Sequence, residues 1–342
     1  MPNNPTKILL STTLVGGILI SISSNSWLGA WMGLEINLMS IIPLMLSQEN
    51  IYTAEASLKY FIIQAMASAS LMFMVMMSAL ASQSLPLSNE VYEYAIMTPL
   101  LLKMGAAPLH WWFPSVMEGL SWTNCLLMMT VQKAAPMMLT SYLIKVTNLT
   151  LMIILLSAFV GALGGMNQTS LRKILTYSSI NHTGWMLTAA MGGNNLWALY
   201  FAVYSLLTST MTTITKSFNI SFINQTLMAN SSKTTIKFML FTTLLSLGGL
   251  PPFIGFLPKW IVIQMMISNN LMTFIMTVMV ILSLTTLYYY LQMCYSSFLI
   301  LHSEVKWNLW PHRSITMMTY STMLASTSLM GLIMCTMIIN IN

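Results

Sequence analysis

The chain has 342 residues, of which 56% are hydrophobic and only 6% are charged, with a formal net charge of +6. A soluble domain usually carries about 25% charged residues, so this composition cannot cover a globule of this size with a water-facing surface. It excludes a soluble enzyme and indicates that lipid surrounds most of the chain. The basic residues form no run or stripe, so the positive charge does not indicate a nucleic-acid partner.

Apolar stretches long enough to cross a bilayer recur along the whole chain, and roughly 20 residues are needed for each crossing. Lipid admits only helices or closed barrels, and the short alternating segments of barrel strands are missing, so we predict about eleven transmembrane helices. Residues 1–24 are interpreted as the first helix and not as a signal peptide, because the pattern continues and an Ala-x-Ala site is missing. The predicted spans are 7–24, 27–46, 56–80, 92–112, 122–143, 148–167, 173–191, 196–215, 237–266, 271–300 and 315–338.

The segments between these spans differ strongly in basic residues. The connections on the cytoplasmic or equivalent side of a membrane carry an excess of Lys and Arg. The basic residues therefore indicate which connections share one side of the membrane. Lys145, beside Glu90 and Glu93, is the one basic residue predicted for the opposite side. We therefore expect the N-terminus on the positive side and the C-terminus across the membrane. The residues predicted for the positive side are Lys7, Lys59, Arg172, Lys173, Lys216, Lys233, Lys237, Lys306 and Arg313.

Four charged residues fall inside predicted spans: Glu35, Lys103, Lys133 and Lys259. Each costs about 2.5–3.5 kcal/mol at a helix centre, and four together cost on the order of 10 kcal/mol, as much as the net stability of a domain. Such groups usually mark a path for ions or protons. The alternative is a structural ion pair, or a side chain that reaches the interface. Glu35 and Lys133 lie deepest in their spans and are hardest to explain in that way.

If Glu35 and Lys103 form an ion pair, the protonation state of the lysine would depend on whether the pair is closed or separated. Burial favours the neutral form of an amine, whereas a neighbouring carboxylate favours its charged form. Separating the pair would release a proton from the lysine and closing it would retain the proton. This is acid–base chemistry without a covalent step.

Two spans, the fourth and the ninth, are interrupted by Gly and Pro, which break helices and expose backbone groups that need polar partners. Interruptions at corresponding places of two halves are typical of transporters with inverted repeats. We predict a single membrane domain over 1–342, with five-helix repeats over 1–146 and 147–300 and a loop and final helix over 301–342. Simple proline kinks remain the alternative. The residues at the breaks are Gly105, Pro108, Gly248, Gly249, Pro251 and Pro252.

His110 and His182 are further candidates for proton transfer, because histidine titrates near neutral pH, although packing histidines would look the same in the sequence. Glu55 and Lys59 are spaced for a structural ion pair on one helix face. Trp111 and Trp112 fit an interfacial aromatic belt. No nucleotide loop, catalytic triad or metal-ligand cluster occurs in the sequence, so we expect neither a bound cofactor nor a bound metal.

Four segments carry a resemblance to a known family: SNSWLGAWMGLEIN (24–37), EASLKYF (55–61), KMGAAPLH (103–110) and GLPPFIGFLPKW (249–260). They resemble the antiporter-like subunit family of mitochondrial NADH–ubiquinone oxidoreductase (complex I), in its arthropod-like chain 2 form. The resemblance covers essentially the full length. It places Glu35, Lys103, Lys133 and Lys259 on the four charged positions of a hydrated mid-membrane axis, and His110 and His182 on polar connecting positions.

This resemblance implies a core membrane-arm subunit of the respiratory chain that takes part in proton translocation. NADH, FMN, iron–sulfur clusters and ubiquinone would be bound by other subunits, with structural phospholipid such as cardiolipin as a further expected ligand. The expected partners are other membrane-arm and accessory subunits and lipid. The expected location is the inner mitochondrial membrane, with the N-terminus in the matrix and the C-terminus in the intermembrane space. A stand-alone cation/proton antiporter and a structural scaffold with inert buried charges remain rival hypotheses.

Overall fold

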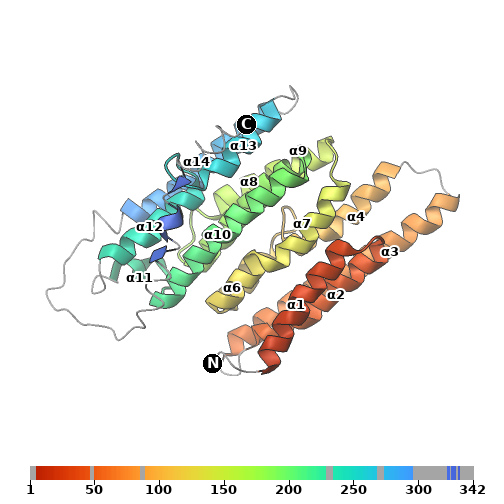
Figure 1. Ribbon diagram of the computed structural model, residues 1–342, viewed down its shortest axis with the longest axis horizontal. Helices are drawn as coiled ribbons and strands as arrows, with labels where there is room; N and C mark the ends of the chain where they lie inside the picture. The colour runs from red at the N-terminus through yellow and green to blue at the C-terminus, as the bar shows by residue number, and fades with distance from the viewer. Residues whose placement is uncertain are drawn as a thin grey trace. The chain divides into compact units, whose positions relative to one another are not determined.

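The structure is a computed structural model that describes residues 5–46, 50–84, 89–228, 234–267 and 273–295, and 322–331 apart from 324 and 329. Over these ranges the chain is α-helical, with one isolated β-bridge between Ser170 and Phe222 and no strand (Figure 1). The all-α prediction is therefore confirmed for the described residues. The predicted loop from 301 and most of the final span, 315–338, lie outside them.

The chain divides into two compact units, Met1–Ile153 and Ile154–Asn342. The helices of the first unit are α1 (Pro5–Ser23), α2 (Trp27–Met45), α3 (Ile51–Ser84), α4 (Asn89–Met104), α5 (Trp112–Gly119), α6 (Trp122–Met129) and α7 (Val131–Leu143). The boundary falls within α8 (Asn148–Gly164). The second unit continues with α9 (Leu171–Gly192), α10 (Asn194–Phe218), α11 (Ile223–Met228), α12 (Thr234–Gly248), α13 (Phe256–Ile267) and α14 (Thr273–Tyr295).

Four of the described helices are long and apolar enough to cross a membrane: Pro5–Ser23, Trp27–Met45, Ile51–Leu80 and Thr273–Tyr295. Shorter apolar helices lie at Asn148–Gly164, Phe238–Gly248 and Phe256–Ile267. The several apolar helices agree with a polytopic membrane protein. The total of eleven spans and the division into inverted repeats stay predictions.

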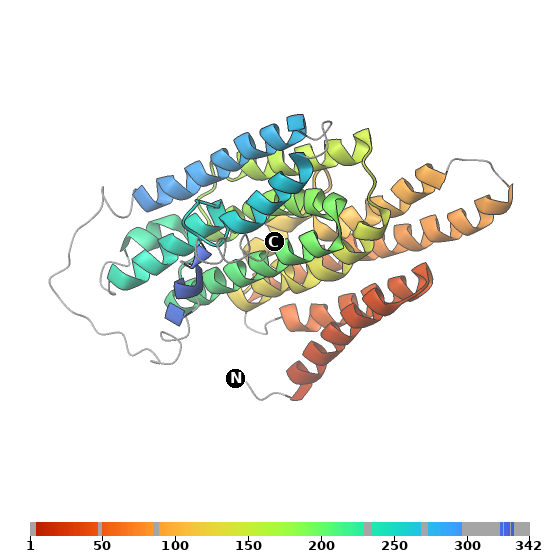
Figure 2. The same ribbon diagram turned by 45° about the horizontal axis from the view of Figure 1, so that its top comes forward.

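Helices α1 and α2 form a tight hairpin at the start of the chain, visible in both views (Figures 1 and 2). Ser26 is the N-cap residue of α2, and its hydroxyl accepts a hydrogen bond from the Gly29 N–H at 3.2 Å. Gly33 and Gly17 let the two backbones touch, because a Cβ at Gly33 would lie 2.5 Å from the Ser21 nitrogen. Small residues allow close approach where lipid provides no hydrophobic force between helices.

Serine and threonine are frequent within these helices, and their hydroxyls find partners inside the same helix. The hydroxyl of Thr140 donates to the Met137 carbonyl at 2.9 Å, and that of Thr210 to the Leu207 carbonyl at 2.7 Å. Such bonds to the preceding turn satisfy a polar side chain without water. This sequence can therefore place many hydroxyls inside an apolar medium.

The span predicted over 122–143 is not one continuous helix, because α6 ends at Met129 and α7 begins at Val131. At the residue between them, the Thr130 hydroxyl donates to the Leu126 carbonyl at 2.8 Å, and the Lys133 N–H bonds the Thr130 carbonyl at 3.1 Å. Pro136 follows and has no N–H to continue the ladder. The interruption lies directly before Lys133.

Candidate functional site

The interruptions after α4 and α12 begin in the same way, with a glycine in the left-handed conformation. Gly105 has a φ of +70° and Gly249 a φ of +84°. At the first, the N–H groups of Gly105 and Ala106 bond the carbonyls of Leu102 and Leu101, both at 3.1 Å. These two hydrogen bonds together form the Schellman motif, which ends a helix at a residue with positive φ.

The end of α4 leaves carbonyls that side chains from other segments satisfy. The Trp112 indole donates to the Leu102 carbonyl at 3.1 Å, and the Gln64 amide of α3 donates to the Lys103 carbonyl at 3.5 Å. Buried backbone groups need such partners in an apolar medium. Trp112 is buried, so the prediction that it belongs to an interfacial belt is wrong; its ring caps a broken helix, whereas Trp111 is 81% exposed.

Lys103 is the second-last residue of α4 and is 7% exposed. The Glu35 carboxylate of α2 favours the charged form of this amine electrostatically, but the two side chains do not form an ion pair. One carboxylate oxygen of Glu35, Oε2, is buried without a hydrogen-bond partner. The predicted Glu35–Lys103 ion pair is therefore not formed in this structure.

Lys133 lies in the first turn of α7 and is 2% exposed. Its ammonium nitrogen lies 4.7 Å from the centre of the Phe113 ring of α5. An aromatic face attracts a cation at this distance. The predicted burial of Lys133 inside the protein is observed, which excludes a side chain that reaches an interface.

A buried polar cluster that we did not predict joins three helices of the first unit. Asn37 of α2 and Gln132 of α7 exchange two amide hydrogen bonds, at 3.1 and 2.9 Å. The Tyr60 hydroxyl of α3 donates to the Gln132 carbonyl oxygen at 3.2 Å. Asn37 and Gln132 are 95 positions apart, so no local pattern could connect them. The cluster borders a small cavity lined by Leu34, Asn37, Leu38, Tyr60, Gln64, Lys103, Gln132 and Pro136.

In the second unit, Lys259 lies in the first turn of α13 and is 5% exposed. Its ammonium donates to the carbonyl of Gly248, the last residue of α12, at 2.9 Å. The nitrogen also lies 5.8 Å from the centre of the Trp185 ring of α9. The broken helix thus supplies the acceptor for the buried amine.

His182 is buried in α9, and its Nδ1 lies 2.8 Å from the Tyr200 hydroxyl of α10. The ring of Tyr204 packs against it with centroids 5.1 Å apart. Asn181 and Trp185, on the same helix, each carry a buried polar side-chain atom without a hydrogen-bond partner. His182 therefore belongs to a polar cluster in the same unit as Lys259.

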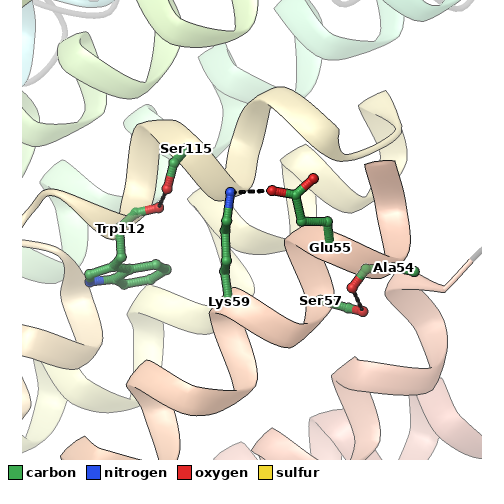
Figure 3. A network of polar contacts seen from close by, with 6 residues as sticks. All are labelled: Ala54, Glu55, Ser57, Lys59, Trp112 and Ser115. Atoms are coloured by element: carbon green, nitrogen blue, oxygen red, sulfur yellow. Dashed lines mark hydrogen bonds and ion pairs between the residues drawn. The ribbon is translucent and has the colours of Figure 1, made fainter. Parts of the chain in front are cut away.

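His110 and the Glu55–Lys59 pair are more peripheral. His110 Nδ1 contacts the carbonyl of Pro108 two residues earlier, at 3.1 Å, near the protein surface. Figure 3 shows Lys59 bound to Glu55 one turn earlier on α3, at 2.6 Å, beside Trp112 and Ser115 of α5. Both charged side chains of the pair are about half exposed, so the predicted structural ion pair is confirmed.

The predicted residues fall into two groups, one in each unit. Glu35, Lys103, Lys133 and the peripheral His110 belong to the first, and Lys259 and His182 to the second. Among the described residues, no cluster of three or more His, Cys, Asp or Glu side chains could hold a metal ion.

Buried amines at interrupted helices, within an apolar all-α fold, are typical of membrane proteins that move protons or cations. The family described as "NADH:quinone oxidoreductase/Mrp antiporter, TM" matches residues 24–286. NADH-ubiquinone oxidoreductase chain 2 of Anopheles gambiae is 49% identical over 327 residues, covering 95% of each chain. The chain therefore belongs to the NADH-ubiquinone oxidoreductase chain 2 family, within these antiporter-like membrane proteins.

Solved structures show that the fold is shared with distant relatives. A chain of respiratory complex I from Thermus thermophilus with bound aureothin superimposes with a TM-score of 0.83, at 22% identity, over 97% of this chain and 79% of that one. A chain of the Mrp complex from Dietzia sp. gives a TM-score of 0.78 at 15% identity, over 94% and 74%. At this identity the likeness establishes the fold alone.

Proposed function

We propose that the chain is a core membrane-arm subunit of respiratory complex I. It takes part in proton translocation across the inner mitochondrial membrane, coupled to NADH oxidation and ubiquinone reduction by other subunits. Family membership supports the assignment to the complex. The observation that carries the role in proton transfer is the burial of Lys103, Lys133 and Lys259, each beside a helix interruption. Each buried amine costs free energy in an apolar medium, so three of them favour a functional role over a purely structural one.

The geometry around Lys103 suits a proton donor controlled by a neighbouring charge. Glu35 and the amine form no ion pair in the structure, so a movement of α2 against α4 that brings them together would strengthen their attraction. Approach of the carboxylate stabilises the protonated amine, and withdrawal favours release of the proton. Lys103 would hold the proton at Nζ while the pair is closed and pass it on when the pair opens.

The protonation of Lys259 would be controlled differently, because its hydrogen-bond partner is a neutral carbonyl. The Gly248 oxygen stabilises the ammonium through one hydrogen bond and through the negative end of the α12 dipole. Changing the distance across the gap between α12 and α13 would therefore change how firmly Lys259 holds its proton. His182, with its Tyr200 partner, is the other titratable group proposed for transfer within the second unit.

The other parts of the assembly follow from the family assignment. We assign NADH, FMN, the iron–sulfur clusters and ubiquinone to other subunits, and propose membrane-arm and accessory subunits, with phospholipid such as cardiolipin, as the contacts of this chain. The basic bias of the predicted connections supports an N-terminus in the matrix and a C-terminus in the intermembrane space. We retain eleven spans, with repeats over 1–146 and 147–300 followed by 301–342, as part of the proposal.

Replacing Lys103 by Met in the assembled complex tests the role in proton transfer. The substitution removes the amine and keeps a long apolar side chain, so we expect proton pumping coupled to NADH oxidation to fall by about a hundredfold or more, the lower end of the usual contribution of a general acid–base group. Lys59→Met is the control, because Lys59 is half exposed and outside the cluster. Full pumping in an assembled Lys103→Met complex would favour the scaffold hypothesis.

A stand-alone cation/proton antiporter is the second candidate, and the buried charges on their own would permit it. Sodium prefers carboxylate and carbonyl oxygens, whereas the chain has no Asp and the four predicted intramembrane charges are three lysines and one glutamate. The residues thus favour proton transfer over sodium binding. Sodium-dependent proton exchange by vesicles that contain the isolated chain would reverse this preference.

A further inference from the structure

The amide pair of Asn37 and Gln132 is built so that both amide groups are tied to each other. Asn37 Nδ2 donates to Gln132 Oε1 at 3.1 Å, and Gln132 Nε2 donates to Asn37 Oδ1 at 2.9 Å. Both side chains are buried. Burying two amides costs stability unless they are satisfied, and the reciprocal pair achieves this while fixing the orientation of each.

The orientation of Gln132 decides the orientation of Tyr60. Gln132 Oε1 is an acceptor that already receives a hydrogen from Asn37, and it receives a second from the Tyr60 hydroxyl at 3.2 Å. A carbonyl oxygen has two lone pairs, so these two donors use its capacity. The Tyr60 proton therefore points at Gln132, and the lone pairs of the Tyr60 oxygen are turned to accept.

Tyr60, Gln64, Gln132 and Lys103 line the same cavity. Its volume is about 10 Å³, close to the smallest space that holds one water molecule. Gln64 also holds the Lys103 carbonyl, so the backbone of the lysine is tied to α3. An acceptor oriented toward this space can bind an N–H of the lysine directly or through one water.

We infer that Gln132, together with Asn37, is a positioning residue for proton transfer at Lys103: the amide pair holds the Tyr60 oxygen as a hydrogen-bond acceptor toward the cavity that Lys103 lines. The amide groups do not take up or release the translocated proton, because they do not titrate. They act by orienting the Tyr60 hydroxyl. This inference rests on the proposed function and adds to it three residues of α2, α3 and α7.

The test compares variants of assembled complex I by the rate of proton pumping and by the solvent deuterium isotope effect on NADH oxidation. Asn37→Leu combined with Gln132→Leu removes both amides together, which leaves no unsatisfied partner in the pair. We expect about a tenfold slower rate, the scale of losing one hydrogen bond in a transition state, and a larger isotope effect. Tyr60→Phe, which removes a single oxygen, should give the same two changes.

Two further variants separate positioning from packing. The exchange Asn37→Gln with Gln132→Asn can re-form a reciprocal amide pair, so we expect it to restore most of the rate and the original isotope effect. Asn124→Leu is the matched control. The Asn124 amide also links to α2, by donating to the Leu44 carbonyl at 3.1 Å, but it does not line the cavity. It should leave the isotope effect unchanged.

The inference is overturned if Tyr60→Phe and the double leucine variant behave as Asn124→Leu does, or if the exchanged pair stays as slow as the double leucine variant. Where the double leucine variant assembles poorly, Tyr60→Phe decides alone, since it changes one atom. Lys103→Met separates this outcome from failure of the proposed function. A normal rate in Lys103→Met removes the proposed function, whereas a slow Lys103→Met beside normal Tyr60→Phe removes only the positioning role.

Discussion

The ammonium of Lys259 donates a hydrogen bond to the carbonyl of Gly248 across the interruption between α12 and α13, at 2.9 Å. Helix α12 ends one residue before Gly249, and its last carbonyls therefore have no N–H partner within the helix. The lysine satisfies one of these carbonyls, and the carbonyl gives the buried amine an acceptor. The same break in the helix thus explains how both polar groups are tolerated.

Gly249 should be irreplaceable at this interruption, while its neighbour Gly248 should tolerate alanine. A Cβ at Gly249 would lie 3.0 Å from Lys259 Nζ, and its φ of +84° is unfavourable for other residues by about 1–2 kcal/mol. At Gly248 the nearest atom would be at an ordinary 3.5 Å. We expect Gly249→Ala to lower the melting temperature of the complex and its pumping rate, and Gly248→Ala to change neither. Equal effects of the two substitutions would contradict this account.

The contact between Lys133 and the Phe113 ring should be measurable as a coupling between the two side chains. A cation over an aromatic face is stabilised by about 0.5–2 kcal/mol, depending on desolvation. In a double-mutant cycle, we expect the activation free-energy changes of Phe113→Leu and Lys133→Met, obtained from the pumping rates, to sum to more than the change of the double mutant by that amount. Additive losses would show that the 4.7 Å approach contributes nothing to the activity.

The hydrogen bond between His182 and Tyr200 predicts a role for the tyrosine hydroxyl. Tyr200→Phe leaves the ring in place and removes the hydroxyl that lies 2.8 Å from His182 Nδ1, a loss of about 0.5–1.5 kcal/mol for one hydrogen bond. We expect slower pumping in the assembled complex. Tyr288→Phe, at an exposed tyrosine of α14, is the control for loss of a phenol oxygen. A Tyr200→Phe complex as active as this control would assign His182 to packing.

The hairpin of α1 and α2 allows a stability test with an internal control. A Cβ at Gly33 would lie 2.5 Å from the Ser21 nitrogen and 2.7 Å from the Gly17 carbonyl oxygen, so Gly33→Ala should separate the helices. We expect a loss of about 1–3 kcal/mol, the usual cost of overpacking, seen as a lower yield or melting temperature of the complex. Gly16 has no atom within 4 Å of the equivalent position, so Gly16→Ala should be harmless. Harm from Gly16→Ala alone would refute the proposed packing.

Several features of the site could be predicted because they depend on residues close together in the chain. Gly105 and Gly249 end their helices through backbone conformation and local hydrogen bonds, which are properties of a short segment. Glu55 and Lys59 meet because residues four apart share a helix face. The interruption at Thr130 escaped prediction because threonine occurs in many unbroken helices here, and no glycine marks the position.

Composition and hydropathy are enough to predict a helical membrane protein with amines inside its spans, because composition sets the solvent and each helix satisfies its own backbone in lipid. Which polar groups meet is visible only in the folded protein: Asn37 with Gln132, Trp112 with the Leu102 carbonyl, and His182 with Tyr200. These contacts depend on how helices rotate and slide against one another. That choice is made by packing over the whole unit, and a local pattern of residues does not contain it.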